Sequence, residues 1–63
     1  MTPKQYQAAI DRLGLSQRAS AAWLGVNERT VRDWCSGETR IPEAVAKLLR
    51  LCVRLELDPE EVK

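Results

Sequence analysis

Histidine and phenylalanine are absent from this sequence of 63 residues, and cysteine is scarce, with only Cys35 and Cys52. Without an imidazole, a cysteine or serine nucleophile has no partner of the usual kind to take up its proton. A zinc site would have to combine two widely separated thiols with carboxylates, which is a poor match to known ligand spacing. We therefore expect no enzymatic activity, no metal site and no cofactor, and we expect both cysteines to be reduced, buried packing residues.

Long apolar runs are also missing, since no stretch approaches the roughly 18 residues of a membrane helix. The N-terminus has no signal-peptide pattern. Charge of one sign is not in excess either, because ten basic residues face nine acidic ones and the net charge is +1. The hydrophobic content of 44% is high enough for folding, which excludes a disordered charged tail. We expect one soluble, cytoplasmic domain over residues 1–63 that makes no contact with a membrane. Because this length leaves no room for a ligand-sensing domain, we expect no small-molecule ligand.

Capping signals and apolar spacing predict a first helix near the N-terminus. Thr2 can cap it, Pro3 suits the first helical position, and Gln5 completes a capping box. Apolar residues then recur at the spacing of one helical face, at Tyr6, Ala9, Ile10 and Leu13. Gly14 follows where a left-handed cap is common, so this helix is expected over residues 3–13.

Two short helices are predicted next, and the connection between them is tight. Each begins after a residue type that commonly caps helices and ends at a glycine: Ser16 and Gly25 bound residues 17–24, and Asn27 and Gly37 bound residues 28–36. Only two residues separate Gly25 from the second of these helices, so the chain must turn sharply, as it does in a helix-turn-helix.

A fourth helix is predicted after a loop over residues 37–41. Pro42 begins this helix, which runs to about Leu57. A further start signal, Asp58-Pro59-Glu60-Glu61, supports at most one more turn. The expected fold class is therefore all-α: a compact bundle of four to five helices that contains a helix-turn-helix at about residues 16–36.

The run from Leu15 to Gly37 resembles the helix-turn-helix domains of the phage-repressor and Cro type, also called the xenobiotic response element family. The shared features are Leu15-Ser16-Gln17, Ala21, Leu24-Gly25-Val26, Thr30-Val31, Trp34 and Gly37. Pro42 also falls where this family often has a proline, so the signature covers residues 15–42. The resemblance implies a lambda-repressor-like fold and sequence-specific binding to double-stranded DNA by a transcriptional regulator of the repressor kind.

One position departs from the family pattern, because Ser20 stands where the family usually has leucine. A serine there loses about 2 kcal/mol or more of apolar burial relative to a fully buried leucine. Trp23, three residues later, is expected either to fill the resulting gap or to stay partly exposed.

The helix over residues 28–36 carries the predicted base contacts. Its core side takes Val31 and Trp34, and the resemblance places base contacts at the charged residues on the other side, Glu28, Arg29, Arg32 and Asp33. Arginine can form a bidentate pair with guanine, and glutamate can accept from N4 of cytosine. The alternative is a pair of ordinary i,i+4 ion pairs on an exposed helix, Glu28–Arg32 and Arg29–Asp33, each worth only ~0.2–0.5 kcal/mol.

Phosphate contacts are expected around the same two helices, from Ser16, Gln17, Arg18 and Arg40. A helix N-terminus is an anion site, and the two arginines add charge, although both can equally be ordinary surface residues. Residues 12–40 hold five basic and three acidic residues, a net charge of only +2, and residues 41–63 hold four basic and five acidic, a net charge of −1. Because affinity for DNA rests largely on phosphate neutralisation, one copy should bind weakly, which favours a dimer.

The helix over residues 42–57 has more apolar surface than a single core contact needs. At about 100° per residue its apolar side chains cover about 220°, whereas a core-facing helix needs a stripe somewhat above 100°. The excess predicts a homodimer through Leu51, Val53 and Leu55, unless the domain encloses this helix more fully. Such a dimer places two recognition helices about 34 Å apart on a palindromic operator. The alternative function is a helical protein–protein interaction module, or an antitoxin-like domain, that binds a partner through the apolar face of this helix.

Overall fold

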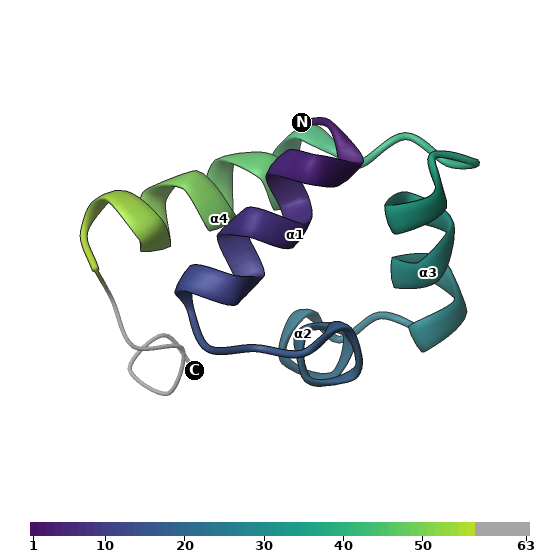
Figure 1. Ribbon diagram of the computed structural model, residues 1–63, viewed down its shortest axis with the longest axis horizontal. Coiled ribbons are helices and arrows are strands. Elements are labelled where there is room, and N and C mark those ends of the chain that lie inside the picture. The colour runs from purple at the N-terminus through teal and green to yellow at the C-terminus, as the bar shows by residue number, and fades with distance from the viewer. Residues whose placement is uncertain (57–63) are drawn as a thin grey trace.

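The computed structural model describes residues 1–56, and this part of the chain holds helices and no strands. Four helices follow one another in the sequence: α1 (Pro3–Arg12), α2 (Gln17–Leu24), α3 (Glu28–Ser36) and α4 (Glu43–Arg54) (Figure 1). None of these four is long and apolar enough to cross a membrane. The start signal predicted at residues 58–61 lies outside the described residues.

The helix starts are capped as the sequence predicts. The Thr2 hydroxyl accepts from the Gln5 N–H at 3.1 Å, and the Gln5 side-chain oxygen accepts from the Thr2 N–H at 2.9 Å, which completes the capping box. Ser16 and Asn27 cap α2 and α3 by accepting from backbone N–H groups of the first turn. The predicted starts of the first three helices are therefore confirmed.

The turn between α2 and α3 depends on a glycine in the left-handed region. Gly25 has φ +74°, a backbone conformation that residues with a side chain rarely adopt, and it ends α2 as predicted. The next N–H, that of Val26, donates to the Ala21 carbonyl at 2.9 Å. Ala21 itself is buried, and α2 packs against α3. The sharp turn of a helix-turn-helix is therefore confirmed.

Three predicted helix boundaries need correction. Helix α1 ends at Arg12, one residue early, with Leu13 as its cap. Helix α4 begins at Glu43 and ends at Arg54, so the predicted range 42–57 is too long. Pro42 precedes the helix as its extended N-cap, and Glu56 has φ +53°, a left-handed conformation that cannot continue a helix.

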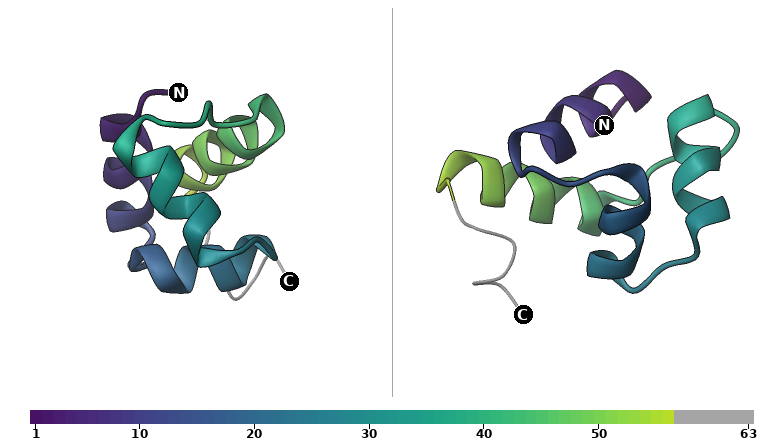
Figure 2. Two further views of the ribbon diagram at one scale, coloured as in Figure 1. Left: turned by 90° about the vertical axis from the view of Figure 1, so that its right-hand side faces the viewer. Right: turned by 60° about the horizontal axis from the view of Figure 1, so that its bottom comes forward.

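Helix α1 packs against each of the other three helices, and α2 packs against α3. Figure 1 shows α1 beside α4, with α2 across one end of α1 and α3 at one end of the long axis. The two further views agree with this arrangement (Figure 2). The last turns of α4 therefore lie at the opposite end of the molecule from α3.

The core joins all four helices and the loop before α4. Its buried residues are Tyr6, Ala9, Ile10, Ala21, Val31, Trp34, Ile41, Ala46, Leu49 and Cys52. The rings of Tyr6 and Trp34 meet edge to face, with centroids 5.7 Å apart. Burial of Ile41 was not predicted, because loop residues show no apolar periodicity.

Ser20 is fully buried, and the side chain that faces it comes from α1. The hydroxyl oxygens of Tyr6 and Ser20 are 2.7 Å apart, and neither residue is exposed. Trp23 is half-buried and packs against the core. Trp23 is thus partly exposed, which agrees with one of the two expectations, and the hydroxyl that meets Ser20 belongs to Tyr6.

Candidate nucleic-acid interface

Helix α3 divides its side chains between the core and the solvent. Val31 and Trp34 are buried, and this anchors one side of the helix. Glu28, Arg29 and Arg32 are exposed, and Asp33 is half-buried. In the left view of Figure 2, α3 is the helix nearest the viewer, with no other helix in front of it. The helix therefore presents a charged side that a groove of DNA could reach.

An ion pair joins the first turns of α2 and α3. The Arg18 Nε lies 2.8 Å from a carboxylate oxygen of Glu28, and these side chains are 88% and 47% exposed. Within residues 1–56 no other ion pair is formed, so the i,i+4 alternatives Glu28–Arg32 and Arg29–Asp33 are not present there. Glu28 is consequently tied to α2, and the guanidinium groups of Arg29 and Arg32 have no carboxylate partner among the described residues.

A shallow hollow brings three exposed charges together with one amide. It has a volume of about 150 Å³ and is lined by Gln17, Arg18, Glu28 and Arg32. Two guanidinium groups therefore flank one carboxylate at the junction of α2 and α3. Residues predicted to contact bases and residues predicted to contact phosphates thus share one surface.

The polar residues at the start of α2 already have partners within the protein. The Ser16 hydroxyl accepts from the Ala19 N–H at 3.0 Å. The Gln17 amide donates to the Gln7 side-chain oxygen at 3.0 Å, which ties α2 to α1. An amide nitrogen carries two hydrogens, so Gln17 keeps a second N–H for another acceptor.

Arg40 lies apart from this hollow, in the loop between α3 and α4. Its side chain is exposed, while the adjacent Ile41 is only 4% exposed. The buried Ile41 anchors the loop to the core and thereby fixes the position of Arg40 on the surface. Arg40 therefore lies beyond the C-terminus of α3, whereas Arg18 lies beside its N-terminus.

The three residues predicted for a dimer interface do not lie on one side of α4. Leu51 and Leu55 are 49% and 56% exposed, more than any other large apolar side chain of the described residues. Val53 is half-buried and packs against the core. At about 100° per residue, Val53 lies roughly opposite Leu51 around the helix. Leu51 and Leu55 therefore form the exposed apolar side without Val53.

The two cysteines are free, with Cys52 buried and Cys35 half-buried. Burial raises the pKa of the Cys35 thiol above its ordinary value of 9.0. The thiol is therefore protonated at neutral pH and is a weak nucleophile. Within residues 1–56, no group of three cysteine, aspartate or glutamate side chains comes together that could hold a metal ion.

Comparison with models of protein families gives a match over most of the chain. A family model described as a helix-turn-helix domain matches residues 7–63. No curated protein and no solved structure matches the chain. The matched range begins within α1 and includes α2, the turn at Gly25, α3 and α4, so it contains the whole charged surface described above.

Proposed function

This chain belongs to the family of helix-turn-helix domains, and from that premise we propose that it binds double-stranded DNA at specific sequences through α3. In this family the second helix of the motif enters the major groove and contacts base edges with its N-terminal residues. One observation carries the proposal. Arg29 and Arg32 are exposed on the first two turns of α3, and neither is paired with a carboxylate among residues 1–56.

The bases are contacted by the charged side of α3. Arg29 and Arg32 each present a planar fork of donors that fits O6 and N7 of guanine. Glu28 accepts from N4 of cytosine, and its pairing with Arg18 holds the carboxylate at the junction of α2 and α3. Asp33, which is half-buried, lies at the edge of this surface and repels phosphates that approach out of register.

Phosphates are contacted on both sides of α3. Arg18, Gln17 and Ser16 meet the backbone at the start of α2, where the helix dipole also favours an anion. Arg40 meets it from the loop beyond the other end of α3. Few cations are involved, so the dependence of affinity on salt concentration should be shallow for one copy and steeper for two.

A homodimer supplies the missing affinity, and α4 supplies its interface. Four apolar residues follow one another along α4 and its C-cap at spacings of four, three and four, the pattern of a coiled-coil seam: Ala44, Leu48, Leu51 and Leu55. Ala44, Leu51 and Leu55 are exposed, and Leu48 is half-buried. Pairing two such helices buries this seam, here called the α4 seam. A two-fold axis through it would place two copies of α3 about one turn of DNA apart, which requires a palindromic operator.

Bound to a promoter, such a dimer would act as a repressor by blocking access to the DNA.

A second function rests on the same exposed leucines. The α4 seam is suited equally to a helix of another protein, as in an antitoxin-like, partner-binding domain. The two functions are distinguished by whether DNA binding depends on α3.

Selection of bound sequences from a pool of random duplexes tests the proposal. We expect one enriched palindrome, and we expect Arg29→Ala with Arg32→Ala to lose it, since each bidentate contact is worth ~1–3 kcal/mol. The matched control is Arg50→Ala with Arg54→Ala, which removes the same charge from α4 and should keep the same enriched sequence. A pool without enrichment, or equal losses in both variants, would show that α3 does not recognise DNA.

A further inference from the structure

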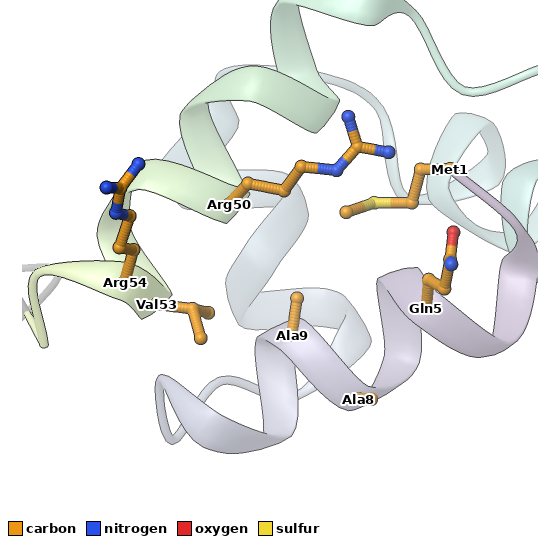
Figure 3. A pocket seen from close by; sticks show the side chains of 7 residues that line it. All are labelled: Met1, Gln5, Ala8, Ala9, Arg50, Val53 and Arg54. Carbon is orange, nitrogen blue, oxygen red and sulfur yellow. The ribbon is translucent and has the colours of Figure 1, made fainter.

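A second hollow lies between α1 and α4. Its volume is about 360 Å³, more than twice that of the hollow beside α3. Among the described residues it is lined by Met1, Gln5, Ala8, Ala9, Arg50, Val53 and Arg54 (Figure 3). We refer to it as the α1–α4 hollow.

Short side chains on α1 leave this space open. Figure 3 shows Ala9 projecting only a methyl group toward α4, with Val53 directed toward it from the opposite wall, and Ala8, which also carries only a methyl group, lines the hollow beside it. Met1 adds a flexible thioether at the N-terminal end. The floor of the hollow is thus apolar, and an apolar side chain inserted there would replace water against it.

The rim of the hollow is positively charged. Figure 3 shows Arg50 extending across the opening toward Met1, while Arg54 extends outward from the edge. Within residues 1–56 no acidic residue lines the hollow, and neither arginine forms an ion pair there. Lys47 and Leu51 join the same two arginines around a smaller depression on the outer side of α4, which extends the positive surface.

We propose that the α1–α4 hollow binds an acidic peptide segment of another protein. An apolar side chain of the segment fills the hollow, and carboxylates on either side of it pair with Arg50 and Arg54. Arginine suits this role because its guanidinium group can hold a carboxylate through two parallel hydrogen bonds. Gln5, at the side of the hollow, offers an amide to the backbone of the segment.

The sign of the charge argues against a second copy of this chain as the occupant. A symmetric contact presents the same surface from both partners. Two copies that met through the hollow itself would bring Arg50 and Arg54 directly against the same cations of the partner, and such like-charge contacts are costly. Pairing through the α4 seam differs, because Arg50 and Arg54 lie about 100° and 60° around the helix from Leu51, beside the paired leucines. An acidic segment of a different protein removes that conflict.

The position of the hollow leaves α3 free. Arg50 and Arg54 belong to the last turns of α4, which lie at the opposite end of the long axis from α3 (Figures 1 and 2). A partner in the hollow can therefore be held while α3 is on DNA. The inference does not depend on DNA recognition, since no residue of the hollow belongs to α2 or α3.

Fluorescence anisotropy on the full chain tests the proposal, with a short labelled peptide in which glutamates flank one leucine. A second peptide has glutamine in place of every glutamate. We expect the acidic peptide to bind, the neutral peptide to bind at least about tenfold more weakly, and added salt to weaken only the acidic one. Amide signals of Ala8, Ala9 and Val53 should shift in the nuclear magnetic resonance spectrum when the acidic peptide is added.

Paired variants separate this site from the DNA surface. Arg50→Gln with Arg54→Gln should weaken peptide binding about tenfold and leave DNA binding unchanged. Arg29→Gln with Arg32→Gln should do the reverse. If both pairs of substitutions weakened peptide binding equally, binding would depend on the overall charge of the protein and not on the hollow, and the proposal would be wrong. The absence of any binding of the acidic peptide would also overturn the proposal. Shifts of the Ala8 and Val53 signals on dilution of the Leu51→Ala, Leu55→Ala variant, in which the α4 seam is removed, would assign the hollow to a second copy instead.

Discussion

The hydroxyl groups of Tyr6 and Ser20 form a hydrogen bond of 2.7 Å at the centre of the apolar core, and neither residue is exposed. The Ser20 hydroxyl also donates to the Gln17 carbonyl at 2.8 Å. Because a serine has a single hydroxyl hydrogen, the Tyr6 hydroxyl must be the donor to Ser20. A fully satisfied polar pair thus links α1 to α2 at the position where the phage-repressor pattern usually has a leucine.

Removal of either hydroxyl should destabilise the fold by unequal amounts. Ser20→Ala leaves the buried Tyr6 hydroxyl without its acceptor and should lower the free energy of unfolding by about 1–3 kcal/mol. Tyr6→Phe removes the donor, while Ser20 keeps its bond to Gln17, so the cost should be about 0.5–1.5 kcal/mol. Urea unfolding followed by circular dichroism measures both.

The double variant completes the cycle. If the two groups are coupled, Tyr6→Phe with Ser20→Ala should cost less than the sum of the single changes by about 1 kcal/mol. Strict additivity would mean that the two hydroxyls stabilise the fold independently.

The difference between local and distant contacts explains what the sequence could predict. The caps at Thr2, Ser16 and Asn27 involve neighbours two or three residues away, and all three were predicted. The bond from Tyr6 to Ser20 joins residues 14 positions apart, and no periodicity indicates it.

The charged surface follows the same division. The exposure of Arg29 and Arg32 follows from the burial of Val31 and Trp34 on the opposite side of one helix, so the helical period was sufficient to predict it. For Glu28, the sequence predicted as one alternative an ion pair with Arg32 of the same helix. Its actual partner is Arg18, because the tight turn brings the start of α2 beside the start of α3.

Alkaline pH should destabilise the protein through Tyr6. Burial raises the pKa of this phenol above its ordinary value of 10.0, the bond to Ser20 lowers it, and the nearby Cys35 raises it. The unfolded chain therefore loses the Tyr6 proton first, so this group leaves the free energy of unfolding unchanged below about pH 10 and lowers it as pH rises above that value. Urea unfolding over this range should show a fall that is smaller in Tyr6→Phe.

Tyr6 is the only tyrosine, so the absorbance of tyrosinate reports this one group. We expect its titration to lie above that of the urea-unfolded chain. A midpoint at or below the unfolded value would contradict the sign of the shift and remove the basis for the pH dependence.

The ion pair between Arg18 and Glu28 should contribute little to stability. Both side chains are well exposed, at 88% and 47%, and exposed pairs are typically worth ~0.2–1 kcal/mol. We expect Glu28→Gln and Arg18→Gln each to change the free energy of unfolding by no more than about 0.5 kcal/mol, measured in urea. A loss above about 2 kcal/mol in either variant would mean that the pair holds α2 and α3 together.

The same substitutions should change DNA binding in different ways. Glu28→Gln alters the group offered to a base, so selection from random duplexes should give a changed preference at one base pair, worth ~1–3 kcal/mol. Arg18→Gln removes a phosphate contact, so it should weaken all sequences alike and reduce the salt dependence. An unchanged preference in Glu28→Gln would exclude this residue from base recognition.

Association through the α4 seam should depend on Leu51 and Leu55. Both are about half exposed in the single chain, so Leu51→Ala with Leu55→Ala should leave the helical circular dichroism intact while removing apolar surface from the interface. Sedimentation at micromolar concentrations should show a dimer for the original chain and a monomer for this variant. Arg50→Ala with Arg54→Ala is the matched control on the same helix, and it should remain dimeric.

Affinity for a palindromic operator should fall in the leucine variant, whereas affinity for a single half-site should not, because each copy still presents α3. A monomer in the original chain at these concentrations would remove the dimer, and an equal fall on both DNA sites would show that the leucines act within one copy.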